Sequence, residues 1–170
     1  AFLIFCAGIN AQTFYIVNTT ADSGPGSLRQ AIIEANADGT ASVVNFSISG
    51  TITLSSTLDP ILQPITITGD RSQVIDGNGA NYGFALISGS SGSEISGLIM
   101  GGFGTAIDVV DTGNHVLSEN YIGMEEDGQT SFSNAIGVSI DNSPGNTIIN
   151  NIISGNTSIG LKISGAGSNN

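Results

Sequence analysis

The sequence predicts an all-β chain folded as a parallel β-helix, a solenoid of about five coils of roughly 23 residues, with a capping strand and an amphipathic helix at its N-terminal end. Three observations support this prediction. Short runs rich in Ile and Val recur at a fixed spacing, with Gly, Asn and Ser between them. Only 10% of the residues are charged, whereas 24 residues are Gly. One stretch near the N-terminus has the period of a helix.

Residues 1–11 resemble the end of a secretory signal peptide, because the apolar run AFLIFCAGINA ends in small residues. We expect them to be a signal-peptide remnant that is cleaved after Ala11, which implies export. A buried first strand is the alternative. Cys6 is the single cysteine, and Phe5 occupies the place where a lipid-attachment signal needs a small residue. The cleaved chain would therefore hold no disulfide.

Residues 12–42 are predicted to form an N-terminal cap. FYIVNTT (14–20) has the pattern of an edge strand, and SGPGSLRQAIIEANADG (23–39) that of a helix with a Ser27–Gln30 capping box. The apolar face of this helix consists of Leu28, Ala31, Ile32 and Ala35, and Ala37-Asp38-Gly39 ends it. The open end of a stack of coils invites further pairing, so we expect the strand and helix to cover it.

Residues 43–170 are predicted to form the β-helix itself. Strand patterns lie within 43–56, 64–79 and 83–92. Three later pairs of segments align with one another. They are EISGLIMGG (94–102) with TAIDVV (105–110), HVLSENYIG (115–123) with IGVSID (136–141), and NTIINNIISG (146–155) with IGLKIS (159–164). The last coil has no second cap in the sequence, so we expect further coils, or another chain, to cover it.

The spacing of the aligned segments predicts columns of equivalent residues and one insertion. The columns are Ile99, Ile122 and Ile153; Ile107, Val138 and Leu161; and Val109, Ile140 and Ile163. The step along a column is 23 residues except where it crosses the loop GMEEDGQTSFSN (123–134), where it is 31, so we expect an insertion of 8 residues there. Alternation places Val138, Ile140, Leu161 and Ile163 inside, and Ser139 and Lys162 outside.

Asn120 and Asn151 are equivalent in this alignment, and Gly97 takes the same place one coil earlier. Asn tolerates left-handed backbone conformations, which suits a tight turn. We expect the two amides to hydrogen-bond to each other as a short ladder that starts at Asn120. Two ordinary loop asparagines are the alternative.

Several of these motifs together resemble the secreted bacterial right-handed parallel β-helix repeat proteins. They are TADSGPGSLRQAIIEANA, TITLSSTLDPILQPITITG, VIDGNG, NYIGMEEDGQTSFSNAIGVSI and NNIISGN, and they cover nearly all of residues 12–165. The resemblance implies a right-handed, pectate-lyase-like β-helix and an extracellular or cell-surface setting. It does not settle the activity, because similar β-helices serve as lyases, hydrolases, epimerases, adhesins and tailspikes.

The charge of the chain excludes some partners. A net charge of −11 disfavours nucleic acid and anionic membrane surfaces, and favours cationic partners or neutral sugars. Outside residues 1–11, no apolar run approaches the roughly 20 residues of a membrane span. T-x-T pairs at Thr51–Thr53 and Thr66–Thr68 suit a sugar-facing array but are too few for one.

Few residues suit catalysis on this fold. As the resemblance implies, a polysaccharide lyase needs a base, and the candidates are Arg29, Arg71, Lys162 and His115, all of which we interpret as packing or surface residues. A hydrolase needs clustered carboxylates, but Asp108, Asp111 and Asp141 do not align with one another. The N-T-D, D-D and G-H-G motifs of such hydrolases are absent, and Asp76 is explained by an Asp-Gly turn.

The loop residues Glu125, Glu126 and Asp127 offer oxygen ligands for Ca²⁺, but their spacing does not match a D-x-D-x-D loop, and a solvated acidic loop is our interpretation. We therefore assign no catalytic, cofactor-binding or metal-binding residue. The sequence favours a non-catalytic module of a secreted or cell-surface protein for adhesion or polysaccharide binding. The alternative is the N-terminal part of a polysaccharide lyase or glycoside hydrolase whose catalytic coils lie beyond residue 170.

Overall fold

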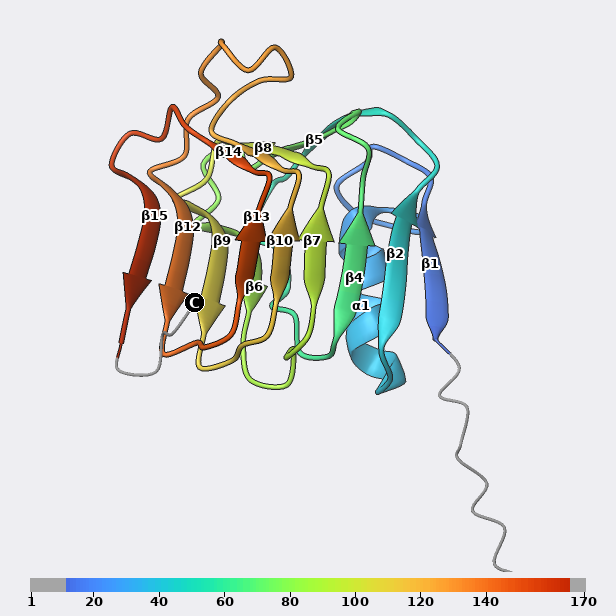
Figure 1. Cartoon of the computed structure of the whole chain (residues 1–170). Helices are drawn as coiled ribbons and strands as arrows, with labels where there is room; N and C mark the ends of the chain where they lie inside the picture. Colours follow the sequence, from blue (N-terminus) through green and yellow to red (C-terminus); the bar gives the residue numbers. More distant parts are fainter. Residues whose placement is uncertain (1–11, 166–170) are drawn as a thin grey trace, which may run out of the picture.

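The computed structural model describes residues 12–165 and is mostly β-structure (Figure 1). The described chain forms one helix and three sheets, and every strand pair within these sheets is parallel. The predicted signal-peptide remnant at 1–11 and the final residues 166–170 lie outside the described residues.

The N-terminal cap begins with strand β1 (Thr13–Val17), which is the edge strand of its sheet as predicted. Helix α1 (Leu28–Asp38) packs against β1 and β2 (Figure 1). Its buried residues are the predicted apolar face, Leu28, Ala31, Ile32 and Ala35. Gly39 ends the helix in the left-handed conformation, at φ 69°, which glycine adopts without steric cost.

The predicted capping box forms only in part. The Ser27 hydroxyl accepts a hydrogen bond from the Gln30 N–H at 3.2 Å, which satisfies one of the free amides of the first turn. The reciprocal bond is missing, because the Ser27 N–H donates to the carbonyl of Gly24 and the Gln30 side chain donates to Glu34. The prediction was therefore right about the start of the helix and wrong about Gln30.

The three sheets have regular orders. Sheet A has the order β1, β2 (Ser42–Phe46), β4 (Ile65–Thr68), β7 (Glu94–Ser96), β10 (Val116–Ser118), β13 (Thr147–Ile149). Sheet B has the order β3 (Gly50–Thr53), β5 (Gln73–Asp76), β8 (Ile99–Gly101), β11 (Tyr121–Ile122), β14 (Ile152–Ile153). Sheet C has the order β6 (Tyr82–Leu86), β9 (Thr105–Val110), β12 (Ile136–Asp141), β15 (Ile159–Ser164).

These orders describe a stack of repeated units. From β4 onwards, each group of three consecutive strands places one strand in each sheet, beside the equivalent strand of the group before it. The groups are β4–β6, β7–β9, β10–β12 and β13–β15, and β2 with β3 forms a shorter first unit. This arrangement is consistent with a parallel β-solenoid, and it places loop residues of successive units side by side.

The register confirms two of the three predicted columns. Ile107, Val138 and Leu161 pair in sequence, and so do Val109, Ile140 and Ile163. The third column was wrong by one residue at its start, since Ile99 pairs with Tyr121 and it is Met100 that precedes Ile122. Its neighbour Ile122 does pair with Ile153.

The predicted insertion is confirmed. Val116 and Thr147 are paired at a distance of 31 residues, whereas Glu94 and Val116 are paired at 22. The extra residues form the loop between β11 and β12, which projects from the sheets (Figure 1, orange) and is closed by a bridge between Met124 and Ser131.

The inward columns form the core, but burial stops at the last described unit. Val138 and Ile140 are fully buried, whereas Leu161 and Ile163, which continue their columns on β15, are 42% and 47% exposed. No described strand lies on the far side of β15. Ser139 differs from the prediction of an outside position, because it is only 8% exposed between its strand partners Asp108 and Lys162.

The predicted asparagine ladder is present. The Asn120 side chain donates to the side-chain oxygen of Asn151 at 3.1 Å, and that oxygen also accepts from the Asn120 N–H at 2.9 Å. The expected place of Gly97 was wrong, because Asn120 accepts from the N–H of Leu98. The left-handed residues are the ones just before these positions.

The left-handed column consists of Gly97, Glu119 and Asn150, with φ of 67°, 58° and 57°. The turn therefore divides two tasks between neighbouring residues. One residue takes the positive φ, and the next points its amide inward to bind the backbone of the adjacent unit.

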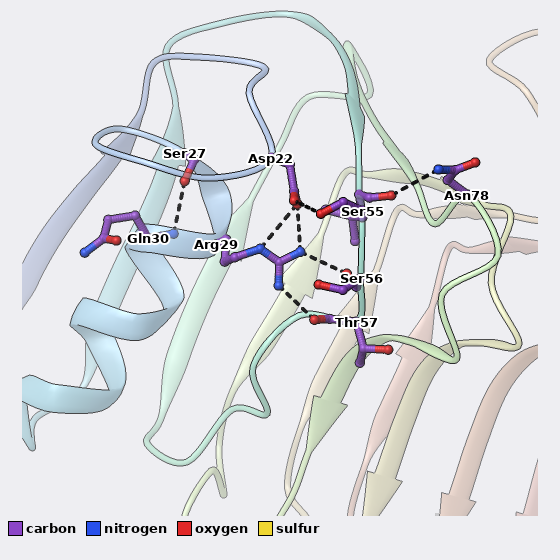
Figure 2. A network of polar contacts seen from close by, with 9 residues as sticks. Asp22, Ser27, Arg29, Gln30, Ser55, Ser56, Thr57 and Asn78 are labelled. Carbon is purple, nitrogen blue, oxygen red and sulfur yellow. Dashed lines mark hydrogen bonds and ion pairs between the residues drawn. The ribbon is translucent and has the colours of Figure 1, made fainter.

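Arg29 joins the helix to the first unit, as the prediction of a capping contact requires. Its guanidinium donates to the Asp22 carboxylate at 2.7 Å and to the carbonyls of Ser56 and Thr57 at 2.9 and 2.8 Å (Figure 2). The Ser55 hydroxyl donates to the other oxygen of Asp22. Burial raises the pKa of Asp22, but the hydrogen bonds from Ser55 and Arg29 outweigh it and hold the pKa below its usual value.

Replacing Asn120 with alanine should lower the free energy of unfolding by about 2–5 kcal/mol, because it leaves the Leu98 N–H and the Ile95 carbonyl buried without partners. Urea unfolding followed by circular dichroism measures this loss. Asn81→Ala is the matched control, since Asn81 is exposed, and it should change the free energy by less than about 0.5 kcal/mol. Equal effects of the two substitutions would contradict the ladder's importance.

Candidate functional site

A groove lies where sheet A turns into sheet B, beside the ends of β2 and β4 and the start of β5. It has a volume of about 190 Å³ and is lined by Asn45, Phe46, Thr68, Gly69, Asp70 and Gln73. The stacking of the first two units makes this site, because Asn45 and Thr68 are register partners on neighbouring strands. The groove therefore combines an aromatic ring with amide, hydroxyl and carboxylate groups.

Gln73 fixes the turn that shapes the groove. Its side chain accepts from the Asp70 N–H at 3.0 Å and donates to the carbonyl of Ile48 at 2.7 Å, and it is only 3% exposed. These bonds hold the turn against the preceding unit. Gln73 therefore acts as a positioning residue for the groove.

Asp70 is held rigidly by its own turn. One carboxylate oxygen, Oδ1, accepts from the N–H and the hydroxyl of Ser72 at 3.0 and 2.6 Å. The Ser72 hydroxyl and N–H together hold the pKa of Asp70 below its usual value, so the carboxylate is charged at neutral pH.

Two polar groups of the groove have no partner among residues 12–165. They are the side-chain amide of Asn45 and the second oxygen, Oδ2, of Asp70. Phe46 is half-buried and packs against the core, so it forms a fixed apolar wall. A fixed wall with a few free polar groups is the usual composition of a small-molecule site.

Next to the groove, Arg71 lies over the ring of Tyr121, with 5.5 Å between the guanidinium carbon and the ring centroid. The contact joins the second unit to the fourth. Arg71 has a positive φ of 68°, which is uncommon for a residue with a side chain and directs it along the turn. Arg71 is therefore a surface packing residue, as predicted.

A second cavity, of about 290 Å³, lies at the other side of sheet A and is lined by Gly39, Thr40, Ala41, Gln63 and Pro64. It contains no ionisable or aromatic side chain. It is larger than the groove but offers fewer groups that recognise a ligand, so the groove is the stronger candidate.

The predicted hydrolase carboxylates do not form a cluster. Asp141 pairs with Val110, and Asp108 pairs with Ser139, as the alignment predicts. Burial raises the pKa of Asp108 and the nearby Asp141 charge adds to this, while Ser139 and Lys162 oppose it. Within residues 12–165, no three His, Cys, Asp or Glu side chains are placed to hold a metal ion.

The acidic loop uses one of its three carboxylates internally. Asp127 accepts from the N–H groups of Gln129 and Thr130 at 2.8 and 2.7 Å and from the Thr130 hydroxyl at 2.6 Å. Both of its oxygens therefore stabilise the loop's own turn. Glu125 and Glu126 are left as the loop's remaining carboxylates, which lends no support to calcium binding there.

The prediction of a solvent-facing His115 was wrong. The side chain is fully buried, and its Nδ1 accepts a hydrogen bond from the Ser93 N–H at 3.2 Å. Its Nε2 is buried with no partner in the described part of the chain. Ser93 and Asn146 precede the neighbouring strands of the same sheet, and an alignment of these three positions could have indicated an inward polar residue.

The groove residues were missed by the sequence analysis. Asn45, Phe46 and Asp70 belong to two segments that become neighbours only through stacking, and no local motif connects them. Thr51–Thr53 and Thr66–Thr68 lie on different sheets, on β3 and β4, so they form no single array.

Comparisons add no further identification. A scan against protein-family models and a search of curated proteins returned no match for this chain. None of the helical structure within 12–165 is long and apolar enough to cross a membrane.

Burial lowers the pKa of His115 to about 4, which is below its usual value near 6.5. The unfolded chain then binds a proton more readily than the folded chain between these values. The free energy of unfolding should fall as the pH drops from about 6.5 to 4, by up to about 1.4 kcal/mol per pH unit from this group. Urea unfolding across this range measures the slope.

His115→Asn is the matched control for this slope, since asparagine supplies the same kind of acceptor at the neighbouring position 146 and does not titrate. The variant should lose the His115 share of the slope and keep the share that carboxylates contribute. Identical slopes in the two proteins would show that His115 does not titrate between these pH values.

Proposed function

We propose that the chain folds as a right-handed parallel β-helix of the pectate-lyase-like kind, with about five coils of roughly 23 residues covered at one end by β1 and α1. The support is the order of the three parallel sheets, in which each successive unit adds one strand to every sheet. The pairing distances of 22 and 23 residues outside the insertion agree with this repeat.

We further propose that the protein is a non-catalytic module of a secreted or cell-surface protein that binds a polysaccharide or cell-surface glycan, as an adhesin does. The observation that carries this proposal is the groove, where the Phe46 ring stands beside the free polar groups of Asn45 and Asp70. Sugars present hydroxyl groups at their edges and C–H groups on their faces. An aromatic wall with amide and carboxylate groups complements both.

The size of the groove fits a surface subsite. Its volume of about 190 Å³ is below the range of about 300–1,000 Å³ that is usual for enclosed ligand pockets. One sugar unit of a longer chain would occupy it while the neighbouring units lie on the sheet. The net charge of −11 repels acidic glycans, so neutral or cationic glycans are the expected ligands.

Titration of the full chain with neutral oligosaccharides of glucose, galactose and mannose, followed by isothermal calorimetry, tests this proposal. Asn45→Ala should weaken the binding roughly 3- to 10-fold, because it removes a hydrogen-bonding group worth about 1 kcal/mol. Asn81→Ala, on an exposed loop, is the control and should leave the affinity unchanged.

Two results would contradict the proposal. Absence of binding to every glycan tested would remove the binding function. Release of reducing ends or of unsaturated sugars from a polysaccharide during incubation would show that the chain is an enzyme, which was the alternative from the sequence.

A further inference from the structure

The Asp70 carboxylate presents one fixed and unused oxygen to the groove. Its Oδ1 is occupied by the N–H and hydroxyl of Ser72, and its own backbone N–H is held by Gln73. The Oδ2 atom accepts no hydrogen bond from any residue between 12 and 165. Because Asp70 is already ordered, a ligand that binds Oδ2 loses little of its gain to side-chain ordering.

No cation of the described chain compensates this charge. The adjacent Arg71 has its guanidinium over Tyr121 and forms no ion pair with Asp70. The salt bridge between Arg29 and Asp22 is the one ion pair within residues 12–165. The third basic residue, Lys162, lies on β15 in sheet C. Asp70 is therefore an uncompensated negative charge at the edge of a small groove.

The rest of the groove limits which cations fit. Phe46 provides an apolar wall, and Asn45 and Thr68 provide neutral hydrogen-bonding groups. A bare metal ion would use none of these, and Asp70 is the only carboxylate that lines the groove. A ring that carries an ammonium group and hydroxyl groups uses the carboxylate, the amide and the aromatic wall together.

We propose that the groove binds a hexosamine unit with a free amino group, as part of a polysaccharide, through an ion pair between the ligand's ammonium group and Asp70. This inference rests on the proposed function and specifies its ligand class. The ammonium group donates to Oδ2, the hydroxyl groups exchange hydrogen bonds with Asn45 and Thr68, and the ring face lies against Phe46.

The test compares three oligosaccharides of one length, which are glucosamine, N-acetylglucosamine and glucose tetramers, by calorimetric titration of the full chain at about pH 6, where amine and carboxylate are both charged. The glucosamine tetramer should bind roughly tenfold tighter than the other two. Asp70→Asn should remove this advantage. Asp59→Asn, an exposed aspartate elsewhere on the surface, should keep it.

A second measurement keeps the test valid if Asp70→Asn disturbs the turn. For the unaltered chain, raising the pH to about 9 deprotonates the sugar amine and should weaken glucosamine binding, while binding of the N-acetylated tetramer stays constant. Equal affinity for the free and N-acetylated tetramers would overturn the inference. So would equal losses in the Asp70 and Asp59 variants, which would indicate attraction to the overall negative charge.

Two further outcomes separate this inference from the proposed function. Binding of all three tetramers with equal affinity, sensitive to Asn45→Ala, would keep the glycan-binding function and reject the amino-sugar ligand. No binding of any tetramer would reject both. A lysine tetramer that binds as tightly as the glucosamine tetramer, and loses affinity with Asp70→Asn, would show that the groove binds amines without reading the sugar.

Discussion

The structure depends on the pairing of backbone N–H groups that point inward at the turns between strands. Within a strand, the neighbouring unit supplies a carbonyl, but at a turn the ladder is interrupted and a buried N–H must find another acceptor. A polar side chain of the next unit supplies it. The side chains that act in this way are Ser93, His115, Asn120, Asn134, Ser143, Asn146 and Asn151. Each unit therefore satisfies the backbone of the one before it.

This constraint explains why buried polar residues coexist with an apolar core. The columns of Ile, Val and Leu drive burial but are tolerant of exchange, whereas each polar side chain accepts from one particular N–H. Asn120 links units in both directions, since it binds Leu98 and Ile95 on one side and Asn151 on the other. His115 fills the same role at a different turn, at the cost of a buried group that titrates.

The N-terminal end solves the same problem differently. The first unit has no preceding unit to receive its inward face, so α1 covers it and Arg29 satisfies the carbonyls of Ser56 and Thr57 (Figure 2). Just beyond this cap, the turn after β4 leaves Asp70 and Asn45 partly unused. The groups that carry the proposed function are thus those that the stacking does not consume.

The sequence by itself determined the strands, the helix and its buried face, the position of the insertion and the Asn120–Asn151 pair, because these depend on local periodicity and on a repeat that the chain states directly. Only the tertiary structure decided the exact register at Ile99, the burial of His115, and the groove that joins Asn45 to Asp70. The physical reason is that these features arise between units. A shift of one residue changes which side chains meet, and the side chains around the groove come from segments whose proximity is set by stacking.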